Sequence, residues 1–291
     1  MRNPLPLLVA GLLAYGVVLV WLTYRRLTRP RRRTYSWALA NNLPGDPGEL
    51  TPALEFVPFE FTSRGRRLKA WDVRGLKAPG PTVVLTHGWS ESKVVMLSRL
   101  GILAPLASRL ILWDLPGHGD SQGVCTLGLE EKSDLLALLD AANIDGELIL
   151  YGFSLGAGLC LEAGERADAV IAEAPYRLEA TPAKNVMAAR GMPSRWNLSA
   201  AVWLVARLRG RSWAGFDRVL AARSLECPLL VLWGARDVVT PRADAEEIAE
   251  AGRGTFVPVP DATHSRLWRD AASADCAGRA VSDFVSTLAG R

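Results

Sequence analysis

Residues 147–164 read ELILYGFSLGAGLCLEAG: an apolar run, a glycine-rich turn and a segment of helical composition. Gly152 and Gly156 flank Ser154 in the pattern G-x-S-x-G. A sharp turn from strand to helix leaves no room for side chains at those two positions, and it lifts the serine hydroxyl above the sheet. The stretch therefore predicts strand, turn and helix, with Ser154 as a candidate nucleophile. A turn built only for packing is the alternative.

Short apolar runs recur on both sides of this stretch. They are continuous in Val, Ile and Leu rather than alternating, as strands buried on both faces require. Segments of helical length separate most of them, which predicts βαβ crossovers and a mostly parallel, doubly wound sheet. An antiparallel hairpin is expected before them, from EFVPFEF and LKAWDV. The expected fold is therefore α/β with about eight strands; the six later runs lie at 82–86, 109–114, 147–151, 169–174, 228–234 and 255–259.

The segment 176–226 interrupts this rhythm. It is too long for a simple crossover, and its run LSAAVWLVARLRG is too apolar for a solvated loop. We predict a small helical cap over the strand ends that contributes to a substrate pocket. An ordinary crossover helix with a decorated loop is the alternative. Trp196 and Trp203 within it could line an apolar pocket or touch a membrane.

The N-terminus differs in composition from the rest of the chain. Residues 3–24 carry no charge, and as a helix they would span roughly 33 Å at about 1.5 Å per residue, enough to cross a bilayer. Six arginines follow within 25–33, and the positive-inside rule places such a cluster in the cytoplasm. We expect a retained single-pass anchor (1–33) with the main domain on the cytoplasmic side. A cleaved signal peptide, with ALA at 38–40 as cleavage site, and a buried helix are the alternatives.

A polar, Pro- and Gly-rich linker is expected over residues 34–53, followed by the catalytic domain over 54–291. Seven of the 34 Lys and Arg residues lie within 1–33, so the remainder holds 27 basic and 30 acidic groups. The basic character thus belongs to one end of the chain, and no nucleic-acid partner is expected. Cys125, Cys160, Cys227 and Cys276 are scattered without a metal-binding spacing. Reduced thiols, no metal and no cofactor are expected.

A serine hydroxyl reacts only when a base takes its proton, and the chain has three histidines. His87 and His118 precede the serine and belong to loop motifs after strands. His264 follows the last predicted strand and precedes the last helix, so it is the candidate base. A surface histidine that caps this helix is the alternative reading.

The base needs a carboxylate to orient it. Asp237 lies just past the strand at 228–234, before a helix for which Thr240 is the expected N-cap. Glu173, at the end of 169–174, is the second candidate because its strand points to the same edge of the sheet. Asp261 is only three residues from His264, which is too close in sequence for its carboxylate to reach the imidazole in the usual orientation.

The order Ser154, Asp237, His264 on an alternating β/α chain resembles the α/β-hydrolase family over roughly residues 55–290. HGWS at 87–90 is similar to that family's oxyanion loop, and DLPGHGDS at 114–121 to its D-x-x-G-x-G-x-S turn. Within the family, HGWSESK, AEAP and the mid-chain cap are more similar to bacterial membrane-associated esterase and peptidase-like branches than to secreted lipases.

The resemblance implies that the backbone N–H groups of Trp89 and Leu155 form the oxyanion hole. HGWS departs from the HGGG form of many lipases and esterases, since it places the bulky side chain of Trp89 where that form has glycine. Lys93 and Arg99 are expected on the solvated side of the helix after this loop.

We therefore expect a serine hydrolase, carboxylesterase- or lipase-like, that cleaves a carboxylic ester through an acyl-enzyme at the cytoplasmic face of a membrane. Its partner would be a small acyl substrate, lipid-derived esters included, since anchoring raises their local concentration. Thioesterase or peptidase activity on the same three residues is one alternative. A non-catalytic, membrane-tethered binding module of the same fold is another.

Overall fold

One eight-stranded sheet organises the chain, in the order β1-β2-β4-β3-β5-β6-β7-β8. The computed structural model describes residues 5–192 and 196–288. The pairs β1–β2 and β2–β4 are antiparallel, and all later neighbours are parallel. The predicted fold class and strand number are thus confirmed. The strands are β1 (Phe56–Ser63), β2 (Arg66–Arg74), β3 (Thr82–Thr86), β4 (Arg109–Trp113), β5 (Leu148–Phe153), β6 (Ala169–Glu173), β7 (Leu229–Gly234) and β8 (Thr255–Val259).

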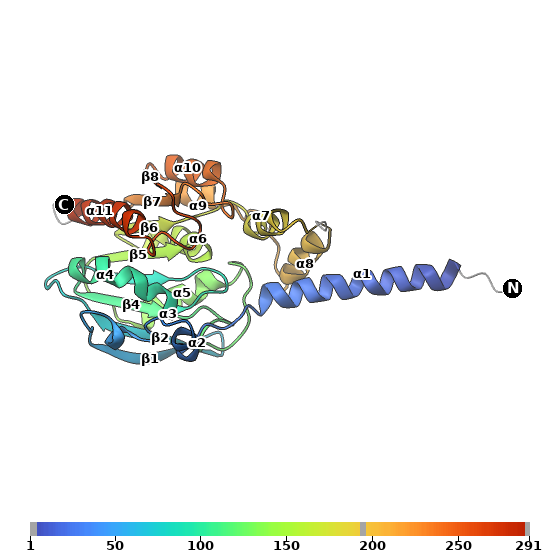
Figure 1. Cartoon of the computed structure of the whole chain (residues 1–291), viewed down its shortest axis with the longest axis horizontal. Coiled ribbons are helices and arrows are strands. Elements are labelled where there is room, and N and C mark those ends of the chain that lie inside the picture. Colours follow the sequence, from blue (N-terminus) through green and yellow to red (C-terminus); the bar gives the residue numbers. More distant parts are fainter. Residues whose placement is uncertain (1–4, 193–195, 289–291) are drawn as a thin grey trace.

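Helices cover both faces of the sheet and bury one apolar cluster on each (Figure 1). This explains the continuous apolar runs, because both faces of the central strands are removed from water. One face packs against α5 (Glu131–Ala141), α6 (Leu155–Glu162), α9 (Arg218–Arg223) and α10 (Arg242–Ala251). The other packs against α2 (Tyr35–Ala40), α3 (Lys93–Met96), α4 (Leu100–Leu103) and α11 (Ala271–Leu288).

The N-terminal helix α1 (Leu5–Thr28) leaves the domain and extends away from it (Figure 1). Within the described part of the chain, α1 is the helix that is long and apolar enough to cross a membrane. None of the residues in its most apolar 18-residue stretch is buried. The segment between β6 and β7 contains α7 (Thr181–Ala189), α8 (Trp196–Arg207) and α9. Of these, α8 lies against α1.

Lys93 and Arg99 correct one expectation. Both are buried rather than solvated, with 3% and 4% of their surface exposed. Each finds a buried carboxylate: the Lys93 ammonium lies 2.5 Å from Asp114, and the Arg99 guanidinium lies 2.8 Å from Glu173. Buried charges persist when they are paired in this way, and a helical pattern alone does not reveal the partner.

Six neighbouring strands of the sheet are parallel, namely β4, β3, β5, β6, β7 and β8. Their carboxyl ends therefore lie at the same edge of the sheet. Ligands bind beyond this edge in open α/β sheets. Ser154 follows β5, Glu173 ends β6 and Asp237 follows β7. His264 follows β8 and completes the set, so four chemically active side chains from distant parts of the sequence come to one place.

Candidate active site

Ser154 lies between β5 and α6 with φ +53° and ψ −108°. This left-handed backbone is strained for a residue with a side chain, and such strain concentrates at functional sites. A Cβ at Gly152 would overlap the backbone of Gly156, and a Cβ at Gly156 would overlap the carbonyl of Thr86. The close approach of α6 to β3 and β5 therefore requires both glycines of the G-x-S-x-G pattern.

The structure brings the three predicted side chains together in a chain of hydrogen bonds. His264 Nε2 lies 3.1 Å from Ser154 Oγ, and His264 Nδ1 lies 2.7 Å from Asp237 Oδ2. Ser154 and Asp237 are buried, while His264 is partly exposed. The Phe153 ring lies 5.0 Å from the imidazole and supports it. This arrangement gives a hydroxyl, a base and an orienting acid in contact.

Asp237 is held by three further donors. The Val239 N–H at 2.7 Å, the Thr240 N–H at 3.0 Å and the Thr240 hydroxyl at 2.7 Å all donate to its carboxylate. Burial alone would raise the pKa of Asp237, but the hydrogen bonds from His264 and Thr240 and the attraction to His264 outweigh it. The pKa of Asp237 is therefore lower than its ordinary value.

Thr240 does not take the expected N-cap role. Helix α10 begins at Arg242, and the Thr240 side chain turns back to Asp237 instead. The acid thus stays ionised and fixed in position.

The hydrogen bonds of His264 define its tautomer. An ionised carboxylate only accepts, so Nδ1 of His264 carries the proton that is donated to Asp237. Nε2 is then free to accept the proton of the Ser154 hydroxyl. This is the protonation pattern that a general base for serine requires.

The hydrogen bonds and burial of His87 and His118 indicate a structural role for both residues. Nε2 of His87 accepts from the Leu115 N–H at 3.0 Å, so its Nδ1 donates to the Gly88 carbonyl. His118 Nδ1 lies 3.0 Å from the Pro116 carbonyl. Both rings are fully buried, and burial lowers the pKa of each to about 3. They stay neutral at pH 7 and order the loops beside the site.

Glu173, the second candidate acid, has different partners. The Arg99 guanidinium forms a two-point ion pair with it, at 2.8 and 3.1 Å, and the Tyr151 hydroxyl donates to it at 2.6 Å. Burial, with the adjacent carboxylate, raises the pKa of Tyr151 well above its ordinary value. Glu173 therefore belongs to a buried polar network behind the nucleophile, and its backbone carbonyl accepts from the Ser154 N–H.

The HGWS loop lies directly beside the nucleophile. A Cβ at Gly88 would come within 3.2 Å of the Ser154 Cβ. The side chain of Trp89 turns away, and its indole N–H donates to the carbonyl of Leu27 at 2.8 Å. Leu155 is the first residue of α6, so its N–H has no partner within the helix. The backbone N–H groups of Trp89 and Leu155 thus belong to the two segments that flank Ser154.

Sequence reasoning missed how firmly the end of α1 is attached to this loop. Besides the Trp89 bond, Arg33 forms a 3.0 Å ion pair with Glu91, and the Thr28 carbonyl accepts from the Cys125 N–H. Arg32 donates to the carbonyls of Gly119 and Ser121. The arginine cluster is the sequence feature that could have indicated these contacts. Its interpretation as a membrane-topology signal left its contacts with the domain unpredicted.

No metal centre is evident in the part of the chain that the structure describes, since it holds no group of three or more His, Cys, Asp or Glu side chains arranged to bind an ion.

Comparisons with known proteins agree with this fold. The chain is 34% identical over 105 residues to the pimeloyl-[acyl-carrier protein] methyl ester esterase of Pectobacterium carotovorum, covering 35% of this chain and 38% of that protein. It is 27% identical over 202 residues to the uncharacterized protein YqkD of Bacillus subtilis, covering 65% of this chain and 66% of the relative. The matches thus span less than two thirds of the length of these curated relatives.

Among solved structures, an esterase of Pyrococcus furiosus superposes with a TM-score of 0.66 at 18% identity, covering 88% of this chain and 98% of that one. At this identity the likeness establishes the fold. The model of the alpha/beta hydrolase family matches residues 83–278, which reach from β3 to β8 and include the loops between these strands. The chain has the hydrolase fold, and it belongs to the alpha/beta hydrolase family.

Proposed function

We propose that this protein is a serine hydrolase that cleaves a carboxylic ester. The observation that carries the proposal is the continuous contact of Ser154 with His264 and of His264 with Asp237, at 3.1 and 2.7 Å. Strain at Ser154 and a depressed pKa at Asp237 support it, because both preset the site for chemistry.

In the first step Ser154 Oγ attacks the acyl carbonyl while His264 Nε2 takes the hydroxyl proton. The carbonyl oxygen becomes an oxyanion, which the N–H groups of Trp89 and Leu155 would hold. His264 then returns the proton to the leaving alcohol, and an acyl-enzyme remains. A water molecule attacks this ester by the same route and releases the acid and free Ser154. Asp237 keeps the tautomer of His264 and stabilises its transient positive charge.

An ester is preferred over an amide as substrate. A curated relative carries the name of a methyl ester esterase, which supports this choice. Thioester or peptide cleavage would use the same three residues and remains the second candidate within catalysis. A non-catalytic binding module would have no use for the strained serine.

Labelling with a fluorophosphonate tests the nucleophile. Wild type should label and should hydrolyse short p-nitrophenyl esters, whereas Ser154→Ala should do neither. Ser286→Ala, which removes an exposed hydroxyl on α11, is the matched control and should behave as wild type. A folded wild type that fails to label would contradict the proposal. Rates on esters, thioesters and amides of matched acyl length would then identify the substrate class.

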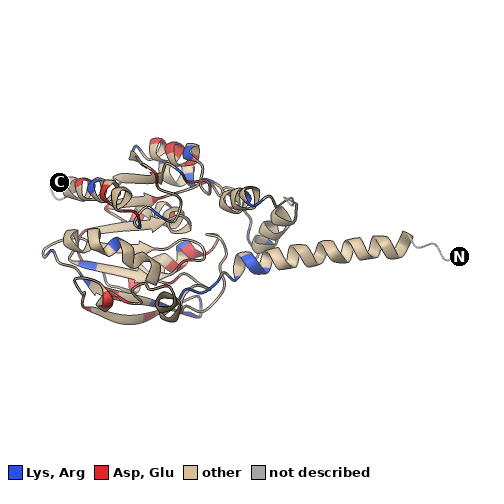
Figure 2. Ribbon diagram, in the orientation of Figure 1, with Lys and Arg blue, Asp and Glu red and all other residues tan. Residues whose placement is uncertain are grey.

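We also propose that α1 is a retained anchor with the catalytic domain on the cytoplasmic side. The bonds from Leu27, Thr28, Arg32 and Arg33 to the domain support retention, because cleavage near residue 40 would remove all of them. The basic residues gather at the end of α1 that adjoins the domain (Figure 2), as the positive-inside rule requires. Protease added outside sealed, right-side-out vesicles should leave residues 34–291 intact; digestion from that side alone would reverse the orientation.

A further inference from the structure

The cap helix α8 runs alongside the apolar part of α1. The Asn197 amide donates to the Thr23 hydroxyl at 2.8 Å. About two turns deeper, a Cβ at Gly16 would lie 3.4 Å from the ring of Trp196. Figure 1 shows α8 beside the half of α1 that is nearer the domain. The two helices are thus in contact within the uncharged stretch of α1.

This contact fixes the depth of α8, if α1 crosses a membrane as proposed above. Gly16 lies nine residues before Arg25, which is about 13 Å along a helix axis. One leaflet of hydrocarbon is about 15 Å thick. With Arg25 at the headgroups, Trp196 must therefore lie well inside the leaflet. If α1 spans the membrane in this way, α8 must enter the same leaflet beside it.

The composition of α8 suits that position. Its inner face, formed by Leu198, Ala201, Val202 and Val205, is buried against the protein. Its outer face exposes Trp196 and Trp203, with 54% and 61% of their surfaces accessible. Amphipathic helices with tryptophan on the apolar face lie at the boundary between headgroups and acyl chains.

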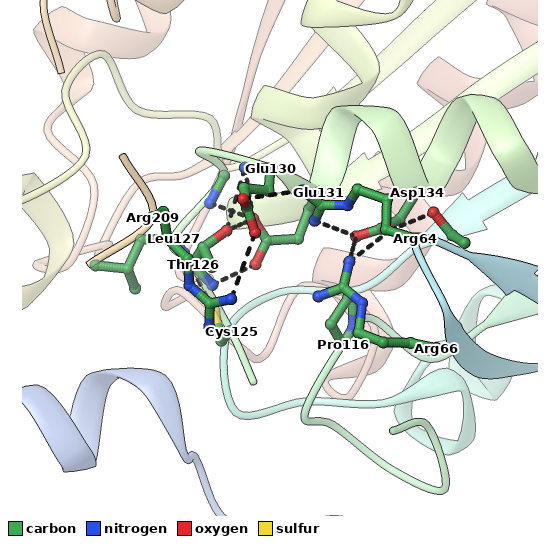
Figure 3. Close-up of polar contacts among 12 residues, drawn as sticks. Arg64, Arg66, Pro116, Cys125, Thr126, Leu127, Glu130, Glu131, Asp134 and Arg209 are labelled. Atoms are coloured by element: carbon green, nitrogen blue, oxygen red, sulfur yellow. Dashed lines mark hydrogen bonds and ion pairs between the residues drawn. The ribbon is translucent and has the colours of Figure 1, made fainter. Parts of the chain in front are cut away.

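The basic end of α8 is its domain-proximal end. Arg207, Arg209 and Arg211 follow the tryptophans. Arg209 lies 3.9 Å from Glu130, at the polar cluster drawn in Figure 3, so this end is held against the catalytic domain. Along α8, as along α1, an apolar part is thus followed by arginines toward the domain. Basic groups at the ends of both helices are complementary to anionic lipid headgroups.

The end of α1 connects α8 with the loop beside the nucleophile. The buried face of α8 belongs to the large apolar cluster on one face of the sheet, which also contains Leu27 and Leu155. The carbonyl of Leu27 accepts from the indole N–H of Trp89. The last turns of α1 therefore contact both α8 and the HGWS loop.

We propose that α8 is a membrane-embedded part of the cap, docked in the anionic leaflet next to α1. The substrate is accordingly an acyl ester that resides in that leaflet and reaches Ser154 from the lipid rather than from water. This inference rests on the proposed function, whose nucleophile and anchor it uses. It adds the docking surface and the physical state of the substrate.

The test uses the full-length protein in vesicles of phosphatidylcholine and phosphatidylglycerol, with two substrates. One is a soluble short-chain p-nitrophenyl ester, and the other is a long-acyl ester incorporated in the bilayer. Trp203→Glu should lower the ratio of embedded-ester to soluble-ester hydrolysis about ten- to hundredfold, because a carboxylate is costly in the leaflet. Leu76→Glu, at an exposed apolar residue after β2, is the matched control and should keep the ratio. An unchanged ratio in Trp203→Glu overturns the inference.

A second measurement does not depend on catalysis. Brominated lipids should quench the exposed rings of Trp21, Trp196 and Trp203. Trp203→Phe should therefore lower the quenched fraction of the tryptophan emission, whereas Trp71→Phe, a change at a buried ring, should not lower it. Equal quenching in wild type and Trp203→Phe overturns the docking of α8. An inactive wild type that still shows Trp203 quenching would instead reject the proposed hydrolase while the docking surface stands.

Discussion

Asp237 and Glu173 occupy equivalent places in the fold, yet their surroundings differ completely. Each stands at the carboxyl end of a buried parallel strand, β7 or β6, and these strands are neighbours. Asp237 meets a partly exposed histidine and three neutral donors. Glu173 meets the fully charged guanidinium of Arg99. A carboxylate can orient a base only when no fixed cation satisfies it first, so position at the sheet edge does not assign the role.

The largest expected effect separates the two acids by activity. Asp237→Asn should lower kcat about 10⁴-fold while the fold is kept, because the amide can donate to His264 and favours the wrong tautomer. The measurement is kcat on a soluble p-nitrophenyl ester, with circular dichroism as the check on folding. A loss below about tenfold would show that Asp237 does not orient the base.

Glu173→Gln should act on stability instead. It leaves the buried Arg99 charge without its partner, which typically costs about 3–5 kcal/mol of unfolding free energy. Urea unfolding measures this loss. The double variant Glu173→Gln with Arg99→Met should recover part of it, because no unpaired charge is left.

If Glu173→Gln were as stable as wild type but catalytically dead, the roles assigned to the two acids would have to be exchanged. Activity of the recovered double variant decides this even when the single variant folds poorly.

The smallest expected effect concerns the donors that hold Asp237. Thr240→Val removes the hydrogen bond from the Thr240 hydroxyl to the charged carboxylate of Asp237. It should lower the free energy of unfolding by about 1.5–3 kcal/mol at neutral pH. It should also lower kcat by up to about tenfold. Because the pKa of Asp237 is lowered in the folded state, this stabilisation is present above the ordinary pKa of about 3.9 and is lost as the pH falls through the lowered pKa. Urea unfolding should therefore show a smaller difference between variant and wild type at about pH 3 than at pH 7. A larger difference in acid would contradict it.

Much of the fold could be predicted because burial on both faces leaves a direct trace in the sequence. The runs at 82–86 and 255–259 coincide with β3 and β8, and the other strands shift by one or two residues. The glycines around Ser154 were equally informative, since only a close backbone approach excludes a Cβ there. Lys93 and Arg99 were misplaced because burial of a charge depends on a partner distant in sequence.

The sequence by itself determined the alternation of strands and helices, the strained serine turn and the apolar N-terminal helix, because each depends on residues close together in the chain. Only the tertiary structure decided which acid contacts His264, that Trp89 binds the end of α1, and that α8 lies beside that helix. Those contacts join residues from 27 to 174 positions apart. No local pattern encodes them, because each joins segments that are distant in the sequence and meet only in the folded molecule.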